Sequence, residues 1–288
     1  MKGSSKNKPS SFSLRFRIHL LPKGSIFYGW WIVVIASFVM YLRSLFWIQS
    51  YGAYAVVFSQ EFGWSMALLA VAYTLIHVES GLLGPLQGWM ADRYGPRLII
   101  SIGLLMYGIG LVLLTLVKTL PVYFFAIIII SVGISLGGYQ TLMVSIVSWF
   151  KRHRTKAIAL TQLGHSLGGL SVPILAYGLE QFGWRTIVFA SGFAAIFLGI
   201  PLVQNIRHRP EEKGEVVDGK ITEKYYNDLL EINNESISLN WQNSLKTRAF
   251  WFISAGHAIA LLSVSTVLVH LIPHLTNKLG MELTEAGL

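Results

Sequence analysis

The sequence predicts an all-α membrane protein, and two observations support that prediction. Of its 288 residues, 53% are hydrophobic and only 13% are charged, whereas a soluble globular domain carries about 25% charged residues. The hydrophobic residues fall in long continuous runs, which is typical of membrane-spanning helices and unlike the alternation over ~10 residues of a membrane β-barrel strand. Composition and pattern therefore argue against a soluble enzyme, a disordered chain and a secreted disulfide-linked scaffold.

Residues 1–24 are rich in Ser, Lys and Arg, and we interpret them as a basic cytoplasmic tail. The apolar runs that follow are long enough to cross the hydrocarbon core, which takes about 20 residues. They predict a six-helix transmembrane bundle over residues 25–204 and a seventh spanning helix further along the chain. The predicted spans are 28–58, 65–90, 97–117, 122–149, 157–180, 185–204 and 249–275.

A polar stretch at 205–247 separates the sixth span from the seventh and is predicted to be a cytoplasmic connector. Four apolar residues in it recur at helical spacing, which favours a short amphipathic helix, while a flexible linker without a specific role explains the stretch equally well. Residues 248–288 contain the seventh span, a loop and a helix start at Thr284. We therefore expect the first half of a larger protein, followed by one helix of a truncated second bundle. The four spaced residues are Ile221, Tyr225, Leu229 and Ile232.

The basic residues predict how the bundle is oriented. With the N-terminus inside the cell, 19 of the 23 Lys and Arg residues fall in cytoplasmic segments. Only Lys118, Arg185 and Lys278 lie on the opposite side, and Arg43 lies within the first span. This asymmetry is what the positive-inside rule requires, so we expect an integral multi-pass protein of the cell membrane with a cytoplasmic N-terminus. Topology and contact with anionic lipid explain the net charge of +9, and nucleic-acid binding is not expected.

Two loops of the chain are similar to each other at an offset of 88 residues. GWMADRYGPRLII at 88–100 aligns with AYGLEQFGWRTIV at 176–188, which matches Gly95 with Gly183. The first loop joins spans two and three on the inside, and the second joins spans five and six on the outside. A match across the membrane predicts two inverted three-helix repeats, an architecture of secondary transporters. A chance similarity between two short loops is the alternative.

The first of these loops carries a charged motif with two glycines. The glycines allow a tight turn, and an aspartate lies near a helix end beside two arginines, so the cluster can act as a latch that closes in one conformation and opens in another. A plain basic loop explains the arginines alone. The latch residues are Gly88, Asp92, Arg93, Gly95 and Arg97. They resemble the G-x-x-x-D-R-x-G-R-[KR] signature of the major facilitator superfamily, with Pro96 shifting the first basic residue by one place.

Further stretches resemble one branch of that superfamily, the monocarboxylate and oxalate:formate antiporters. The resemblance implies twelve spans in two halves and a secondary active transporter that moves a small organic anion, a mono- or dicarboxylate, by alternating access. The implied partners are that anion, a proton or counter-anion, the lipid bilayer and the missing C-terminal half. The alternatives are a proton-coupled transporter of drugs or neutral solutes, and a non-transporting membrane receptor or scaffold. The stretches are YGWWIV at 28–33, EFGWS at 61–65, WFKRHRTKA at 149–157, RPEEKG at 209–214, TRAFW at 247–251 and VHLIPHLT at 269–276.

Two ionisable residues, Arg43 and Glu79, lie in the middle of the first and second predicted spans. A charged side chain at the bilayer centre costs at least ~2.5–3.5 kcal/mol, so each should face a partner or a cavity. Their equal depth on consecutive antiparallel helices is compatible with a structural ion pair. Alternatively, Arg43 binds an anionic substrate while Glu79 takes up a proton or balances the empty site. Accommodation at the lipid surface is a third interpretation.

Other polar residues within the spans are candidates for substrate binding or proton coupling, although hydrogen bonds between packed helices explain each of them as well. Glycines in spans four and five recur near every fourth position, which predicts close helix packing, and Pro173 predicts a bend. The further candidates are Tyr51, Tyr54, His77, Tyr139, Gln140, His165, His257 and His270.

We expect no enzyme activity from this sequence. The chain has no cysteine, which excludes disulfides, thiolate nucleophiles and Cys-based metal sites. Neither the phosphate-binding G-x-x-x-x-G-K-[ST] pattern nor the metalloprotease H-E-x-x-H pattern occurs. We therefore expect no cofactor and no metal, and the energy for transport should come from an ion or counter-substrate gradient.

Overall fold

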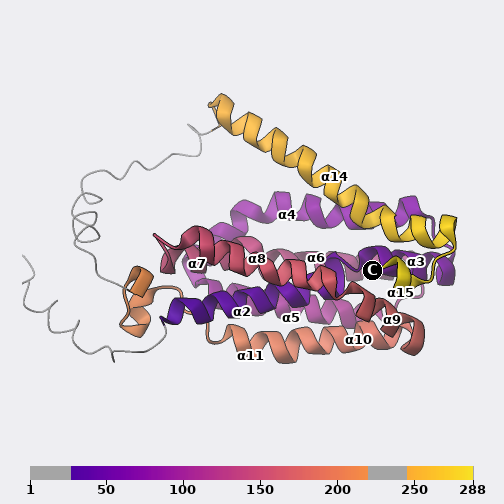
Figure 1. The fold of residues 1–288 in the computed structure, drawn as a ribbon, viewed down its shortest axis with the longest axis horizontal. Coiled ribbons are helices and arrows are strands. Elements are labelled where there is room, and N and C mark those ends of the chain that lie inside the picture. Colours follow the sequence, from indigo (N-terminus) through magenta and orange to yellow (C-terminus); the bar gives the residue numbers. More distant parts are fainter. Residues whose placement is uncertain (1–26, 220–244, 288) are drawn as a thin grey trace, which may run out of the picture.

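The computed structural model describes residues 27–219 and 245–287. The basic tail at 1–24 and the possible amphipathic helix of the connector lie outside these described residues. Within them, every regular element is a helix, and seven helical units are long and apolar enough to cross a membrane. The predicted all-α membrane fold and its seven spans are therefore confirmed (Figure 1).

Several spans consist of more than one helical segment. The first span is α2 (Tyr28–Arg43), a π-helical turn (Ser44–Ile48) and α3 (Tyr51–Phe62); the second is α4 (Met66–Tyr94) and the third is α5 (Pro96–Leu114). The fourth is α6 (Leu120–Leu136) with α7 (Tyr139–Trp149), and the fifth is α8 (Arg154–Leu170) with α9 (Val172–Phe182). The sixth is α10 (Trp184–Ala194), a π-helical turn (Ala195–Gly199) and α11 (Ile200–Val203); the seventh is α14 (Arg248–Leu279), followed by α15 (Leu283–Ala286).

Local sequence signals explain where several of these helices start and stop. Ser65 caps α4 by accepting a hydrogen bond from the Leu68 N–H at 3.3 Å, which satisfies a backbone donor that has no partner within the helix. The fifth span breaks at Ser171, two residues before Pro173 in the first turn of α9, as the predicted bend requires. The fourth span breaks at Gly137 and Gly138, where the backbone of Gly138 is extended.

The helices of the six-span bundle approach closely because small residues lie between them. Gly164 of α8 faces α2, and a methyl group added there would overlap the carbonyl oxygen of Ser37. Gly168, one turn further along α8, lies in the same way against Ser44. Such contacts stabilise helix pairs in lipid through van der Waals packing, because lipid removes the hydrophobic driving force between helices. The predicted packing role of these two glycines is confirmed.

The internal repeat has a structural counterpart. Gly95 links α4 to α5 with φ 82° and ψ 147°, and Gly183 links α9 to α10 with φ 77° and ψ 148°. Both conformations lie in a region that favours glycine. The two turns lie at opposite ends of the bundle (Figure 1). The matching turns therefore support the predicted pair of inverted three-helix units.

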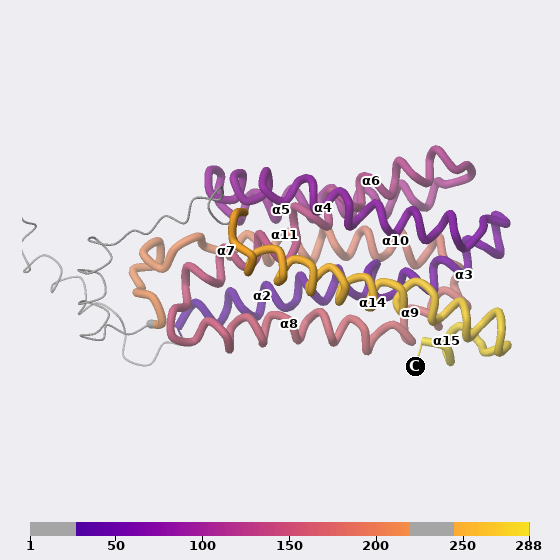
Figure 2. The backbone as a smooth tube through the Cα atoms, turned by 90° about the horizontal axis from the view of Figure 1, so that it is seen from above, coloured from indigo at the N-terminus to yellow at the C-terminus, as the bar shows by residue number. Residues whose placement is uncertain are grey.

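We call the end of the bundle with the α4–α5 and α7–α8 turns the basic end, and the end with the α9–α10 turn the opposite end. At the opposite end α14 packs on α3, where Gly52 lies beside the Leu268 carbonyl and Ile272. Thr284 of the following helix, α15, donates its hydroxyl to Glu180 at 2.5 Å. Toward the basic end α14 leans away from the bundle (Figure 1), and residues 248–264 are exposed. Seen from above, α14 runs over the bundle between α4 and α8 (Figure 2).

The first part of the connector folds onto the basic end. The Asp218 carboxylate accepts hydrogen bonds from the backbone N–H groups of residues 151–153, including that of Arg152 at 2.7 Å. The Glu215 carboxylate accepts from the Tyr28 N–H at 3.0 Å, and the Trp149 indole donates to the Arg207 carbonyl at 2.9 Å. Partial burial raises the pKa of Glu215, against the opposing effects of the Tyr28 N–H and Lys213. The connector is therefore attached to the bundle at least as far as Asp218.

Candidate functional site

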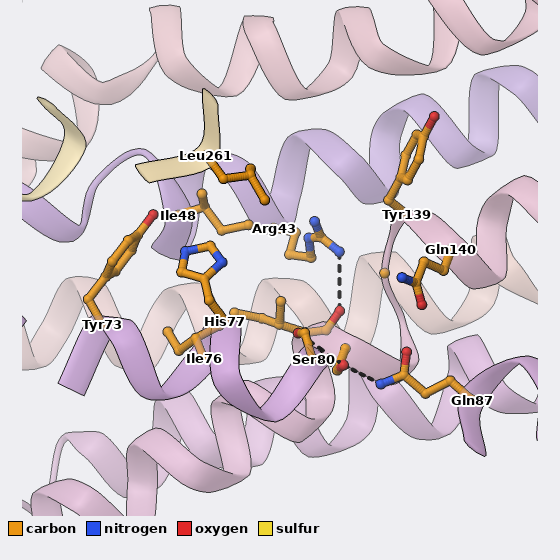
Figure 3. Close-up of a pocket in the computed structure, with 13 residues that line it drawn as sticks. Arg43, Ile48, Tyr73, Ile76, His77, Ser80, Gln87, Tyr139, Gln140 and Leu261 are labelled. Carbon is orange, nitrogen blue, oxygen red and sulfur yellow. Dashed lines mark hydrogen bonds between the residues drawn. The ribbon is translucent and has the colours of Figure 1, made fainter. Parts of the chain in front are cut away.

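A cavity of about 300 Å³ lies between α2, α4, the α6–α7 junction and α14 (Figure 3). It forms because α14 leans away from α4 on one side while the fourth span is interrupted on the other. Four of the candidates predicted from the sequence line it: Arg43, His77, Tyr139 and Gln140. Tyr73, Ser80, Gln87 and Ser135 also line it and were not among the predicted candidates.

Arg43 lies at the end of α2, and its side chain faces the break in the fourth span. Its Nη1 donates a hydrogen bond to the Ile134 carbonyl at 3.1 Å, one of the carbonyls that the end of α6 leaves without a helical partner. Its Nε is buried and has no hydrogen-bond partner. A guanidinium carries five N–H donors, so Arg43 keeps donors available beside the cavity (Figure 3).

The break gives Arg43 the room it needs. A methyl group added at Gly138 would lie 2.5 Å from Arg43 Nη1 and 2.5 Å from the Ile134 carbonyl, so a side chain here conflicts with the observed bond. The extended backbone at Gly138 also separates α6 from α7, and no side chain caps the N-terminus of α7. The sequence indicated only a helix-packing role for Gly137 and Gly138. The structure shows that they also interrupt the fourth span beside Arg43.

Glu79 belongs to a polar cluster between α4 and α6. The Ser131 hydroxyl donates to one of its carboxylate oxygens at 2.9 Å, and the other oxygen is buried without a partner. A second chain of bonds runs from Gln87 through the Ser135 hydroxyl to Ser80, with 3.2 Å between the two serine oxygens. The cluster thus borders the cavity through residues of this second chain.

The predicted ion pair between Arg43 and Glu79 is wrong for this structure. Both residues are described, and each has a different partner: Arg43 bonds to the end of α6, and Glu79 bonds to a serine of the same helix. No ion pair connects them. Equal depth in the membrane did not bring them together because the fourth span supplies the Ile134 carbonyl to Arg43 and the Ser131 hydroxyl to Glu79.

His77 lies where two cavities meet. Its ring packs edge-on against Tyr73, with 5.2 Å between the ring centroids. A second cavity of about 350 Å³ between α4 and α14 shares Tyr73, His77 and Leu261 with the first. His270 of the seventh span lines only this second cavity. The two cavities therefore form adjoining parts of one groove along the α4–α14 side of the bundle.

The remaining candidates lie away from the groove. Tyr51 and Tyr54 are fully buried among aromatic rings, and Tyr51 donates its hydroxyl to the Leu69 carbonyl at 2.5 Å. His165 lies 3.3 Å from the Gln49 amide, measured from its Nε2 to Gln49 Nε2. His257 is exposed on the part of α14 that leans outward. For both tyrosines the structure supports a role in packing between helices.

The expected charged latch is not assembled in this conformation. Asp92 is exposed and has no ion pair among the described residues. Arg93 stacks instead over Trp89, 5.2 Å from its ring centroid, and Arg97 donates through Nε to the Gln204 side chain at 2.8 Å. Gly88 has no neighbouring atoms that a side chain would meet, so only Gly95 of the two motif glycines has a conformational requirement.

No group of three or more His, Cys, Asp or Glu side chains is placed to hold a metal ion in the described part of the chain. Ser135 falls within GISLG at 133–137, which matches the G-x-S-x-G pattern of a hydrolase nucleophile. Here that pattern starts inside a membrane-spanning helix and not at a strand-to-helix turn. The GISLG match therefore does not form the exposed turn that presents a hydrolase nucleophile.

Comparison with known proteins decides the family. The sequence model of the Major Facilitator Superfamily matches residues 29–288. The chain belongs to the major facilitator superfamily. Its seven long apolar helices make it a multi-pass membrane chain of this superfamily, and the comparisons support no particular branch.

Two proteins of similar sequence and one solved structure show which kinds of protein this major facilitator chain is similar to. The fujikurins efflux protein of Gibberella fujikuroi is 28% identical over 189 residues, which cover 64% of this chain and 40% of that protein. A probable chloroplastic anion transporter of rice, Oryza sativa subsp. japonica, is 24% identical over 263 residues, 90% of this chain and 44% of that one. A bacterial homologue of the human lysosomal transporter Spinster, solved inward-facing and unoccupied, gives a TM-score of 0.66 at 17% identity, covering 92% of this chain and 59% of that chain. The chain thus spans less than half the length of these two sequence relatives.

Three cavity residues that sequence reasoning missed, Ser80, Gln87 and Ser135, share one signal with Ser131, which bonds to Glu79 nearby. Ser131 and Ser135 are four residues apart in the apolar fourth span, which places them on one helix face. Ser80 and Gln87 are seven apart on the second span and face them. Polar residues at these spacings on two predicted spans indicate a shared polar face, even where no single residue is charged.

Proposed function

We propose that this chain is part of a secondary active transporter for small organic anions, working by alternating access with proton symport or anion exchange. The observation that carries the proposal is Arg43, a cation midway along the first span whose Nε is buried without a partner beside a cavity. An unbalanced charge in the membrane interior is costly. A carboxylate or another anionic group supplies both the missing charge and the missing acceptor.

The position of α14 supports an alternating-access mechanism. The seventh helix packs on α3 at the opposite end and leans away at the basic end, so the groove opens toward the basic end. Because Lys and Arg concentrate there, we propose that this end is cytoplasmic and that the described conformation is open to the cytoplasm. Rocking of the two halves around the cavity would then expose it to the other side.

Glu79 is proposed as the proton-coupling or charge-balancing group. One carboxylate oxygen is bonded to Ser131 and the other is buried without a partner. Protonation of that second oxygen would make the side chain neutral, and the neutral form is the one that burial in the membrane interior favours. If exchange without protons is the mechanism, Glu79 balances Arg43 while the site is empty. Both versions keep anion binding at Arg43.

Uptake by proteoliposomes tests the proposal, using the protein expressed from its complete reading frame. The probes are labelled acetate, benzoate, succinate and glucose 6-phosphate, with uncharged xylose as a comparison. The Arg43→Lys variant keeps the charge but loses the planar pair of donors, so we expect carboxylate uptake about tenfold weaker. Unchanged uptake by Arg43→Lys and Arg43→Gln would remove the substrate role. A Tyr54→Phe variant, altered in the packed aromatic cluster, is the matched control.

A second candidate function is export of an apolar compound. Its support is the similarity to the fujikurins efflux protein, together with the apolar side chains of Ile48, Ile76 and Leu261 in the cavity. If uncharged apolar probes are transported and all anions are not, this second function replaces the first. If the purified protein moves neither class, a receptor or scaffold is the better interpretation.

The proposed orientation has its own test. Because these 288 residues contain no cysteine, single-cysteine variants of this chain can be labelled without a background from it. A membrane-impermeant thiol reagent applied to intact cells should label Lys118→Cys at the opposite end and leave Arg152→Cys at the basic end unlabelled. The reverse labelling pattern would overturn the cytoplasmic assignment of the N-terminus.

A further inference from the structure

The interrupted fourth span places a helix N-terminus at the cavity. α7 has 11 residues and begins at Tyr139, after the extended Gly138. The first N–H groups of a helix have no partner within it, and here no side chain caps them. Gly138, Tyr139 and Gln140 all line the cavity. In a membrane, backbone groups of this kind are tolerated only where protein, water or a ligand satisfies them.

A second, independent feature at the same place points to an anion. Arg43 lies across the break, with Nη1 bonded to the Ile134 carbonyl and Nε buried without a partner. The Thr141 hydroxyl, in the first turn of α7, is also buried and unpartnered. Figure 3 shows the Arg43 guanidinium on the same side of the cavity as Tyr139 and Gln140. The Arg43 guanidinium and the uncapped first residues of α7 therefore border the same part of the cavity.

We propose that the N-terminus of α7 and Arg43 together form the subsite for the carboxylate of the substrate. The inference rests on the proposed anion-transport function and adds the second half of the binding site. One carboxylate oxygen accepts from the Arg43 guanidinium, and the other accepts from backbone N–H groups at Tyr139 and Gln140. A helix N-terminus favours anions through the same aligned N–H groups that are left unbonded.

The charge of the subsite favours a monocarboxylate. Arg43 contributes one positive charge and the helix N-terminus the equivalent of about half a charge, so a single carboxylate is nearly balanced. A dianion such as succinate or a phosphate monoester would leave charge uncompensated by this subsite, because the described residues that line the cavity include no second Lys or Arg.

The rest of the cavity indicates what the carboxylate is attached to. Ile48, Ile76 and Leu261 are apolar, and Tyr73 adds an aromatic ring. The volume of about 300 Å³ is at the lower end of the ~300–1,000 Å³ range of ligand pockets. A compact apolar or aromatic body therefore fits this wall, and benzoate is the probe that combines it with one carboxylate.

Replacing Tyr139 by proline isolates the backbone donor. Proline at the first helical position removes only an N–H that the helix does not use, and the extended Gly138 (φ −88°, ψ −170°) has the conformation required before proline. The Tyr139→Ala variant loses the same ring and keeps the N–H, so it is the matched control. The measured quantity is the benzoate KM in proteoliposomes, with thermal stabilisation of the detergent-solubilised protein by benzoate as a second readout.

We expect the KM of Tyr139→Pro to exceed that of Tyr139→Ala by about tenfold, the loss of one hydrogen bond to a charged group. The same KM in both variants would overturn the subsite while leaving the proposed function intact. Absence of carboxylate uptake by the wild type would instead overturn the proposed function. Should Tyr139→Pro not fold, benzoate protection of a Tyr139→Cys variant from a thiol reagent decides: protection supports the subsite, and unprotected labelling refutes it.

Discussion

Replacing Gly138 by alanine should weaken anion binding by displacing Arg43. The added methyl group would lie 2.5 Å from Arg43 Nη1 and from the Ile134 carbonyl, whereas unstrained contacts between such atoms are about 3.5 Å. Shifting the guanidinium by about 1 Å breaks the 3.1 Å bond to Ile134. The cation then loses its fixed position relative to α7, although it keeps its charge.

The expected size of the effect follows from that bond. A hydrogen bond that involves a charged group contributes about 1.5–3 kcal/mol, which corresponds to roughly a 10- to 150-fold change in affinity. We therefore expect the KM for benzoate uptake by Gly138→Ala proteoliposomes to rise by at least about tenfold. The maximal rate should fall less, because the substitution does not touch the ends of the helices that move.

Gly137→Ala is the matched control for this experiment. It alters the same break, but the added methyl group would meet the Gly133 carbonyl at 3.2 Å and does not reach Arg43. Its KM should stay within about threefold of the wild type. If Gly138→Ala also remains in that range while folding normally, the fixed position of Arg43 is irrelevant to binding and the reasoning is refuted.

Three further predictions concern other parts of the bundle. Glu79→Gln should retain at least about half of the wild-type substrate counterflow but lose pH-gradient-driven accumulation by about tenfold or more, because an amide imitates the protonated acid; equal losses in both assays would contradict proton coupling. Glu61→Gln removes a partly exposed ion pair with Arg185 of 2.6 Å at the opposite end, so unfolding should become easier by less than about 1 kcal/mol in a denaturant titration, and a much larger loss would contradict this weak pairing. Glu215 has a raised pKa, so its carboxyl group binds a proton more tightly in the folded chain than in the unfolded chain. Attachment of the connector should therefore weaken as the pH rises from the ordinary carboxyl pKa through the raised one. Hydrogen exchange at 205–218 should show this trend in the wild type and not in Glu215→Gln.

Hydropathy alone located the seven spans, because each run of apolar residues has only one stable arrangement in lipid, the hydrogen-bonded helix. The internal repeat was also readable, since glycine is required at both Gly95 and Gly183 by the same backbone conformation. Depth along a span was sufficient to select Arg43 and Glu79 as unusual residues. The grouping of Arg43 with His77, Tyr139 and Gln140 was only partly predictable, because span boundaries give depth and not the direction in which a side chain points.

The sequence by itself determined that this chain crosses a membrane several times, that its charges are asymmetric and that ionisable groups lie at mid-depth. Only the tertiary structure decided their partners. The interruption at Gly138 turned one helix into two and gave Arg43 the carbonyl of Ile134, while Glu79 bonds to Ser131 of α6. The physical reason is that helix rotation and local breaks depend on packing among all spans, whereas hydropathy and charge act on each span separately.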